Sequence, residues 1–416
     1  MTDRPNQTPD VVVIGGGPAG LAAAVELRRR GASNVVVLER DVAAGGIPRQ
    51  CAHIPFGMRE FGWVHSGMAY ARKAVSLAER SGVDIRTRHG VVALYPGGEL
   101  SVATPDGPLV IKARRVLIAT GVRETPRSAR LVSGGRPGGI FTTGILQSMV
   151  NLQNLRPCNR PLIVGTELVS FSALHTARGA GMKPVAMIET GHRITARQPA
   201  QFYPRVLGVP LYYETQLHAI HGRDWVDGVT VQNARGDLQD IACDGVLFTG
   251  CFVPESSLAR LSHLALDPMS GGPVIDQFGR CSDPAYFAAG NLLRPVETAG
   301  WCFREGTAAA KWIAADLEAG DIVPYPGGEI PDIRVSCEAP LKLVVPQMLI
   351  PDRRDGMQQL QLRVSSAATG QLTVSADGVT IWQKRFSALP ERRLSIPLSA
   401  LRIPTRCKAL TVTLRS

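Results

Sequence analysis

Short apolar runs alternate with helix-favouring stretches along the first third of the chain. Residues 11–14 are all Val or Ile, and glycine-rich residues separate them from the helix-favouring stretch 21–29. Further apolar runs cover 34–38 and 116–119, and the second of these is closed by Thr120-Gly121. Runs of this length bounded by turn residues are typical of buried strands. The pattern therefore predicts an α/β unit in which strands and helices alternate.

A strand–helix pattern recurs further along the chain, and an alternating pattern replaces it near the end. Residues 161–165 are an apolar run that ends in glycine, followed by a helix-compatible run to Arg178 and a strand at 184–189. Residues 286–291 predict another strand closed by glycine, with a helix at 303–319. After 324–328, apolar and polar residues alternate at 359–364, 371–375, 380–386, 392–398 and 409–414. This alternation predicts a small all-β unit, which we interpret as a sandwich.

Residues 15–20 carry a glycine pattern that fits a pyrophosphate. Gly15 allows a sharp turn, Gly17 lets the backbone approach the phosphates, and Gly20 lets the helix pack closely on the strand. The phosphates would lie against free N–H groups at the positive end of the helix dipole. Glu39 follows the second strand, about 20 residues past the last glycine, where an acid binds the adenosine ribose. The spacing predicts a dinucleotide site.

Composition narrows the class of protein. The chain has 416 residues, enough for two or three domains, and is 44% hydrophobic and 19% charged, as in folded soluble proteins. Polar residues precede the first strand directly, so we expect neither a signal peptide nor a membrane span, and a cytoplasmic location. The eight cysteines form no C-x-x-C pair, which argues against a redox disulfide, a zinc ribbon or an iron–sulfur cluster; no metal site is expected.

The positive charge is concentrated near the end of the chain. The net charge is +11, and residues 341–416 hold twelve Lys or Arg and four Asp or Glu. These charges are interleaved with strand residues and lack the aromatic platforms of a nucleic-acid groove, so nucleic acid is not an expected partner. Two interpretations stand: a solvated sheet face, or a surface that docks an acidic partner or membrane headgroups.

The predicted strand ends resemble the signatures of flavoproteins with two dinucleotide-binding domains. Residues 115–121 resemble the second signature, in which Ala119, Thr120 and Gly121 would lie beside the nucleotide. The strand around Val91 is similar to the family strand that contacts adenine through its backbone. The chain as far as about residue 325 resembles the pyridine-nucleotide-disulfide-reductase-like flavoproteins, of which thioredoxin reductase is the simplest member.

The resemblance implies where the flavin itself would lie. In the family, a strand end such as Gly290-Asn291 meets the ribityl chain, and a helix start such as Thr298-Ala299 faces the pyrimidine of the flavin. Asn291 stands where relatives often have Asp, and its amide oxygen can still accept hydrogen bonds from the ribityl hydroxyls. FAD is the implied cofactor.

Convergence of separated pieces on one cofactor implies a discontinuous FAD domain. We expect it at 1–125 and 245–325, with a second Rossmann-like domain of the NAD(P) type inserted at 126–244 and a β-rich domain at 330–416. The expected fold class is therefore α/β, with two Rossmann-like dinucleotide-binding domains and a small C-terminal all-β domain.

Two departures from the family pattern bear on function. The inserted domain lacks the C-x-x-C of thioredoxin-reductase-like enzymes, which argues against disulfide reduction. In its nucleotide loop, Glu167 occupies the position where a pyrophosphate requires close backbone approach, and Ser170 replaces the third glycine. We interpret this loop as poorly suited to NAD(P)H; the alternative is that it shifts and binds an adenine nucleotide through Glu189.

Residues 45–61 resemble a narrower group. They are similar to FAD-binding subunits encoded with glycerol-3-phosphate-dehydrogenase-like or amino-acid-oxidising partners, such as the alpha subunits of opine oxidase, hydrogen cyanide synthase and sarcosine oxidase. The resemblance implies an FAD-dependent oxidoreductase, the electron-transferring subunit of a dehydrogenase or oxidase acting on an amino acid, opine or polyol phosphate. The alternatives are a self-sufficient NAD(P)H-dependent flavin reductase and a non-catalytic nucleotide-binding scaffold subunit.

Several residues in this segment have two interpretations each. Gly45 and Gly46 let a loop pass the flavin closely, and Arg49 either neutralises phosphate or flavin charge or is a solvated loop residue. Cys51 lacks a resolving partner and is expected to be inert. His53 is a candidate acid/base or a bystander. The implied cofactor residues are Gly15, Gly17, Pro18, Ala19, Gly20, Glu39, Arg40, Gly45, Gly46, Arg49, Val91, Ala119, Thr120, Gly121, Gly290, Asn291, Thr298 and Ala299; no catalytic residue is assigned.

Overall fold

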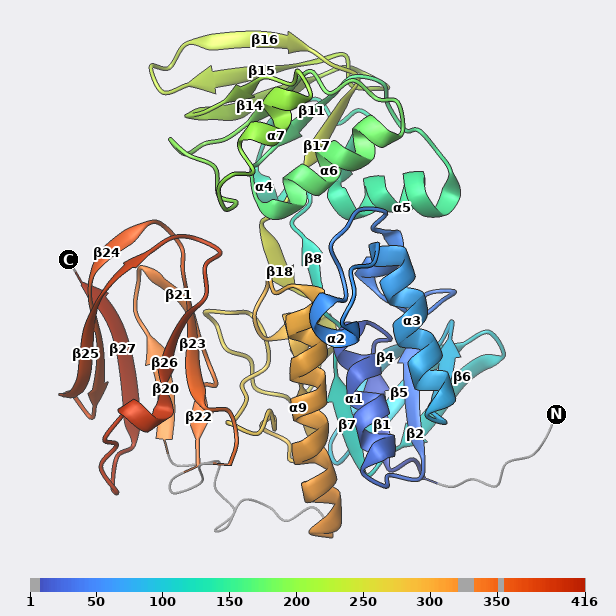
Figure 1. The fold of residues 1–416 in the computed structure, drawn as a ribbon, viewed down its shortest axis with the longest axis vertical. Helices are drawn as coiled ribbons and strands as arrows, with labels where there is room; N and C mark the ends of the chain where they lie inside the picture. Colours follow the sequence, from blue (N-terminus) through green and yellow to red (C-terminus); the bar gives the residue numbers. More distant parts are fainter. Residues whose placement is uncertain (1–7, 321–332, 351–354, 416) are drawn as a thin grey trace.

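A computed structural model describes residues 8–320, 333–350 and 355–415 of the protein (Figure 1). Its lower half in this view contains a five-stranded parallel sheet of order β19-β7-β1-β2-β3. We call it the first sheet. Its strands are β1 (Val11–Ile14), β2 (Val35–Glu39), β3 (Asp84–Thr87), β7 (Arg115–Ile118) and β19 (Tyr286–Ala288).

Alternate side chains of the first sheet pack into two different hydrophobic cores. Val11 and Val13 pack against helices α1 (Pro18–Arg29), α3 (Gly67–Arg80) and α9 (Ala299–Glu318). Val12 and Ile14 face the antiparallel sheet of β4 (Gly90–Tyr95), β5 (Glu99–Thr104) and β6 (Gly107–Lys112). Both faces of the sheet are therefore covered, which is why its strands read as continuous apolar runs.

A second parallel sheet, of order β10-β17-β11-β12-β13, lies above the first in Figure 1. Its strands are β10 (Ile140–Thr142), β11 (Pro161–Val164), β12 (Ala186–Ile188), β13 (Leu211–Tyr212) and β17 (Gly245–Phe248). One face packs on α5 (Thr143–Gln153), α6 (Leu168–Gly179) and α7 (Phe202–Val206). The other packs on the sheet of β9 (Ser133–Gly134), β14 (Thr215–His221), β15 (Gly228–Asn233) and β16 (Leu238–Ala242). Two antiparallel strands, β8 (Val122–Glu124) and β18 (Phe252–Pro254), connect the halves.

The C-terminal strands form a two-sheet sandwich around their own core. One sheet has the order β22-β20-β27-β24-β25 and the other β21-β23-β26. The strands are β20 (Ile333–Cys337), β21 (Leu341–Val345), β22 (Met348–Leu349), β23 (Gln359–Val364), β24 (Ala368–Ala376), β25 (Val379–Ala388), β26 (Leu394–Pro397) and β27 (Ala409–Arg415). The five strands expected from alternation are confirmed as β23 to β27. The expected fold class is confirmed as a whole.

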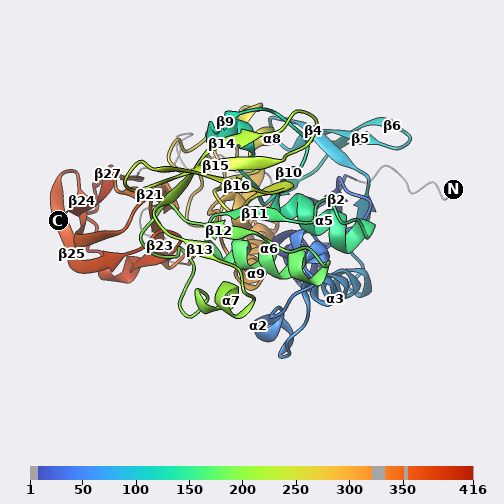
Figure 2. The ribbon, with the colours of Figure 1, turned by 90° about the horizontal axis from the view of Figure 1, so that it is seen from above.

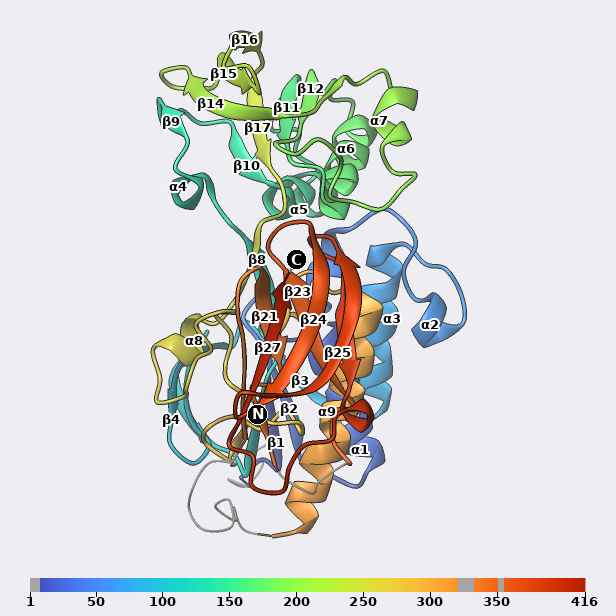
Figure 3. The ribbon, with the colours of Figure 1, turned by 90° about the vertical axis from the view of Figure 1, so that its left-hand side faces the viewer.

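The sandwich is joined to the first half of the molecule. Figures 1 and 3 show it beside the first sheet, and Figure 2 shows it on the side opposite α3 and α5. Leu343 and Val345 of β21 lie in the same core as Val12 and Ile14. Gln347 donates its backbone N–H to the carbonyl of Ile275 at 3.1 Å. The sandwich therefore closes a core that the first sheet leaves open on that side.

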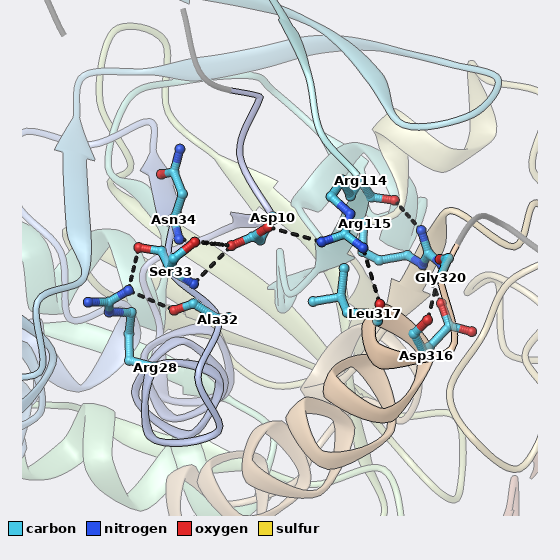
Figure 4. Close-up of polar contacts among 10 residues, drawn as sticks. All are labelled: Asp10, Arg28, Ala32, Ser33, Asn34, Arg114, Arg115, Asp316, Leu317 and Gly320. Carbon is cyan, nitrogen blue, oxygen red and sulfur yellow. Dashed lines mark hydrogen bonds and ion pairs between the residues drawn. The ribbon is translucent and has the colours of Figure 1, made fainter. Parts of the chain in front are cut away.

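A polar network ties together the amino ends of strands in the first sheet (Figure 4). Asp10 accepts hydrogen bonds from the backbone N–H groups of Ser33 at 2.9 Å and Asn34 at 3.0 Å, and from Arg114 at 3.2 Å. Burial opposes these bonds, but together they hold the pKa of Asp10 below its usual value. A buried Arg115–Asp316 ion pair joins β7 to the end of α9. These contacts fix the amino ends of the strands, and the carboxyl ends remain for a ligand.

The remaining elements are short helices: α2 (Met58–Phe61), α4 (Arg127–Arg130), α8 (Ser257–Arg260), η1 (Ile47–Gln50), η2 (Gly290–Leu292) and η3 (Leu398–Ala400). No helix in the described ranges has both the length and the apolar character needed to cross a bilayer. The expected linker at 324–328 and the boundaries at 325 and 330 lie outside the described residues. The division into domains stays a prediction.

Candidate functional site

The loop at residues 15–20, which we call the first loop, connects β1 to α1. Gly15 has a φ of 108°, and a Cβ there would lie 2.6 Å from the carbonyl oxygen of Ala119. A Cβ on Gly20 would overlap the carbonyl of Gly15. Gly17 differs, because the nearest atom to its Cβ would be the Cα of Gly46 at 4.0 Å. Two glycines are thus required by packing, and the third leaves open space at the start of α1.

Glu39 anchors this loop from the end of β2. Its carboxylate accepts hydrogen bonds from the N–H of Gly16 at 2.9 Å and the N–H of Asp41 at 2.9 Å. The backbone of His89 donates to the carbonyl of Glu39 at 2.9 Å, which brings the strand carrying Val91 beside it. Each carboxylate oxygen keeps a lone pair for a ribose hydroxyl. Arg40, which follows Glu39, is exposed.

The expected cofactor residues of three other segments gather at the same edge. Residues 119–121 follow β7, and the hydroxyl of Thr120 donates to the carbonyl of Glu255 at 2.7 Å. Gly290 follows β19 with a φ of 81°, and a Cβ there would lie 2.9 Å from that of Ala19. The carboxyl ends of β1, β7 and β19 therefore meet the starts of α1 and α9, where open α/β sheets bind their ligands.

Residues 45–53 fold over the first loop. The N–H of Gly45 donates to the carbonyl of Gly16 at 2.7 Å. The guanidinium of Arg49 pairs with Asp41, in the loop that follows β2, at 2.8 Å, so its charge is already paired within the protein. Burial raises the pKa of the Cys51 thiol to about 12, which agrees with an inert thiol. Burial lowers the pKa of His53, so its ring is neutral near pH 7.

Glu297 connects the two segments expected to meet the flavin. Its N–H donates to the side-chain oxygen of Asn291 at 2.8 Å, and the Asn291 amide nitrogen donates to its carbonyl at 3.1 Å. Asn291 thus holds the turn that precedes Thr298, the residue at the N-cap of α9. One lone pair of the Asn291 oxygen remains for a ribityl hydroxyl.

The carboxylate of Glu297 pairs with Arg363 and Arg393 of the C-terminal sandwich. The pattern of the sequence gives these arginines no role at the site. Arg363 stands in a strand whose alternation is set by Leu360 and Leu362, so it reads as one more solvent-facing cation. Only the fold reveals that it faces the first half of the molecule.

Residues 165–170, which we call the second loop, repeat the geometry of the first loop with other chemistry. Gly165 has a φ of 112°, but the N-cap of α6 is Glu167. The Glu167 carboxylate accepts the N–H of Cys251 at 2.7 Å, and its other oxygen is buried without a hydrogen-bond partner among the described residues. Burial raises the pKa of Glu167 to about 7. The hydroxyls of Ser170 and Thr249 lie 2.6 Å apart.

The acid that follows β12 also makes hydrogen bonds within the protein. The Glu189 carboxylate accepts the N–H of Gly191 at 2.8 Å and a hydrogen bond from the hydroxyl of Thr166. The carbonyl of Thr166 accepts the N–H of Ala196 at 2.8 Å. The 191–196 segment therefore packs directly on the second loop.

Two parallel sheets with a nucleotide-type loop each place the protein in the class with two dinucleotide-binding folds. The chain belongs to the pyridine nucleotide-disulphide oxidoreductase family, whose pattern matches residues 9–306. This confirms the resemblance found from the sequence. All eight cysteines are free, and no group of three His, Cys, Asp or Glu in the described ranges could hold a metal ion.

Curated relatives include components of sarcosine and opine oxidases. The alpha subunit of sarcosine oxidase from Rhizobium meliloti (strain 1021) is 25% identical over 372 residues, which is 83% of this chain and 34% of the relative. An opine oxidase subunit from Agrobacterium tumefaciens (strain Ach5) is 24% identical over 309 residues, 68% of this chain and 61% of the relative. The chain thus spans between one third and three fifths of the length of these relatives.

Solved structures share the fold. The thioredoxin reductase of T. acidophilum matches with a TM-score of 0.63 and 23% identity over 75% of this chain and 99% of that one. L-proline dehydrogenase from P. horikoshii matches with a TM-score of 0.58 and 17% identity over 75% of this chain and 56% of that one. Family and fold together imply FAD binding and an oxidoreductase.

Proposed function

We propose that the chain binds FAD along the first loop and works as the electron-transferring subunit of a multi-subunit dehydrogenase or oxidase. The pyrophosphate would lie in the open space at Gly17, against the N–H groups at the start of α1. Glu39 would hold the adenosine ribose. The starts of η2 and α9, at Asn291 and Thr298, would hold the ribityl chain and the pyrimidine.

The residues of the first loop fit FAD because its glycines leave space for a pyrophosphate. Side chains at Gly15 and Gly20 are excluded by backbone atoms, whereas the space at Gly17 is free to receive a ligand. Bound FAD would supply the hydride and electron chemistry. The residues of the chain bind it, orient it and exclude water; none in the described ranges is assigned as an acid or base.

The observation that carries the proposal is the carboxylate of Glu167 at the start of α6. A nucleotide pyrophosphate in the usual position would meet this carboxyl group, which fills the space and, where it is ionised, repels the phosphates. Glu167 takes the place that is open at Gly17 in the first loop. We therefore propose that electrons reach the flavin from a partner and not from NAD(P)H bound to the second loop. An adenine nucleotide held through Glu189 remains the alternative.

A partner surface is available beside the expected flavin. Ile54, Met58 and Trp63 are 64%, 56% and 71% exposed, and they belong to the segment that follows the 45–53 loop. Next to α2, a hollow of about 370 Å³ is lined by residues that include Arg59, Arg304 and Lys311. Exposed apolar residues with a charged rim are typical of protein contacts.

The relatives named as subunits support such a partner, and their names suggest an amine, amino-acid or opine substrate. A polyol phosphate remains an option from the sequence resemblance.

The purified 416-residue chain tests this proposal. We expect a flavin absorption spectrum with one FAD per chain, and no bleaching on anaerobic addition of NADH or NADPH at micromolar concentrations. A colourless chain that takes up no added FAD would leave the scaffold alternative. Rapid bleaching by either nucleotide would show that the chain is a self-sufficient reductase.

A further inference from the structure

Glu297 is held from two sides at the junction between the two expected flavin contacts. Its backbone is fixed by the amide of Asn291. Its carboxylate is fixed by the guanidinium groups of Arg363, on β23, and Arg393, just before β26. The turn at 291–298, which we call the flavin turn, is therefore positioned by the C-terminal sandwich.

The side chains of these ion pairs are almost excluded from solvent. The side chains of Glu297 and Arg363 are 5% and 3% exposed, and that of Arg393 is 20% exposed. The Nε of Arg393 adds a hydrogen bond to Glu297 at 3.2 Å. Removing one partner of such a pair leaves a buried charge uncompensated, which is strongly unfavourable. The sandwich and the flavin turn are thus coupled energetically.

Arg393 also holds the first turn of α9. Its guanidinium carbon lies 3.7 Å from the ring centre of Trp301, and that of Arg304 lies 3.9 Å from the same centre. An arginine within about 6 Å of an indole ring is attracted by its electron cloud. One residue of the sandwich therefore contacts both the flavin turn and the helix that starts from it.

The cluster carries an excess of positive charge. Beneath the flavin turn, buried Arg294 pairs with Glu305. The Glu60 carboxylate lies against Gly300 in the first turn of α9, and Arg304 lies over Trp301 in the same turn. Counting these groups, four arginines face three glutamates. The Nε and Nη1 of Arg294 and the Nε of Arg363 have no hydrogen-bond partner among the described residues. Charge interactions act over a longer range in a dry environment than in water. The positive end of the α9 dipole points to the same place.

We propose that the C-terminal sandwich supplies residues that position the flavin site and adjust the midpoint potential of the flavin. Arg363 and Arg393 are positioning residues that fix the flavin turn through Glu297, and the excess positive charge of their cluster favours the reduced flavin. This inference rests on the proposed function, in which Asn291 and Thr298 hold the flavin. Reduction adds negative charge to a flavin, so positive charge nearby raises its midpoint potential.

Two variants of opposite charge test the inference in the 416-residue chain. Arg363→Met removes a positive charge and Glu297→Gln removes a negative one, and both release the flavin turn. The matched controls are Arg415→Met and Glu338→Gln, which break an exposed ion pair that also lies within the sandwich. The readouts are the dissociation constant of added FAD and the midpoint potential of the bound flavin.

We expect both variants to bind FAD about tenfold more weakly than the wild type, because a buried charge pair is broken. The potential should fall in Arg363→Met and rise in Glu297→Gln, each by about 30 mV, which is a tenfold change in relative affinity for the two flavin states. The controls should match the wild type. A purely structural role would shift both potentials in the same direction or in neither.

Wild-type affinity and potential in both variants would overturn the inference and leave FAD binding intact. A wild-type chain that binds no FAD would overturn the proposed function and this inference together. If Arg363→Met does not fold, Arg393→Met replaces it, because Arg393 is less buried. For Arg393→Met we also expect weaker FAD binding and a lower midpoint potential.

Discussion

The two nucleotide-type loops share one backbone and differ in what their helix starts can accept. Each begins with a glycine of φ near 110°, Gly15 or Gly165. In each, the residue that follows the neighbouring strand, Ala119 after β7 or Thr249 after β17, donates its N–H to the carbonyl just before that glycine. The N-cap is Gly17 in the first loop and Glu167 in the second. One helix start remains open to an anion, and the other is filled by a carboxyl group of its own. A shared fold therefore does not imply a shared ligand.

The C-terminal sandwich also makes different contacts near the two loops. It holds the flavin turn through Arg363 and Arg393, and it places the Lys342–Glu391 pair near Glu167. Arg392 also donates to the carbonyl of Thr195, in the segment that packs on the second loop. The sandwich thus supports the first site and lies over the second.

The largest effect is expected where the open helix start is filled. Gly17→Glu would place a side chain and a negative charge in the pyrophosphate position, and we expect FAD affinity to fall by more than about a hundredfold, or ~3 kcal/mol. Flavin absorbance after gel filtration measures it. Gly179→Glu, at the exposed end of α6 with open space around it, is the control. Stoichiometric FAD on folded Gly17→Glu would refute the assignment.

The next effect tests whether the first sheet depends on the sandwich. Leu343 is 1% exposed and lies in the core with Val12 and Ile14. We expect Leu343→Ala to lower the free energy of unfolding by about 2–4 kcal/mol. Denaturant unfolding followed by flavin release measures it, with the exposed residue Val379 as the site of a control Val379→Ala. An unchanged midpoint would mean that the sandwich is an independent appendage.

A smaller effect is expected from the charge inside the second loop. Because the folded pKa of Glu167 is raised from 4.5 to about 7, its contribution to stability is complete below pH 4.5 and is lost as the pH rises through 7. Glu167→Gln removes this loss, so it should be more stable than wild type by about 1–3 kcal/mol at pH 8. The difference should disappear near pH 4. Parallel pH profiles would contradict the burial of this carboxylate.

The smallest effect is a gain of function. Glu167→Gly should let the second loop approach a pyrophosphate, so slow anaerobic bleaching by NADH should appear at millimolar concentration. Ser170 and the packed 191–196 segment still obstruct the site, which is why only weak binding is expected. Stopped-flow absorbance measures it against wild type. Bleaching equal to that of wild type would show that Glu167 is not the obstacle.

The sequence was sufficient to predict features that depend on residues close together in the chain. The glycine spacing at 15–20 and the acid at Glu39 predicted the first loop. The resemblance of the strand ends at Gly121 and Gly290 to flavoprotein signatures predicted which segments converge with it. Glu167 was also recognisable, since it breaks a spacing rule. These signals depend on neighbours in the sequence.

The roles of the sandwich could not be found in this way. The ion pairs of Glu297 join residues 66 and 96 positions apart, and an arginine in an alternating strand carries no mark of its partner. The basic excess of the tail suggested a docking surface, yet Arg363 and Arg393 are paired inside the molecule. Lys384 and Arg385, on β25, do remain exposed, as the solvated-face interpretation expects. Docking to an acidic partner stays a prediction.

The most direct test of the difference between the loops is a crystal structure of the chain reconstituted with FAD and soaked in NAD⁺. We expect electron density for one FAD, with its pyrophosphate at Gly17 and its flavin at the flavin turn. We expect no nucleotide at the second loop, where the carboxylate of Glu167 remains at the start of α6. A nucleotide pyrophosphate at the second loop, or FAD placed away from the first, would contradict the proposed division of roles.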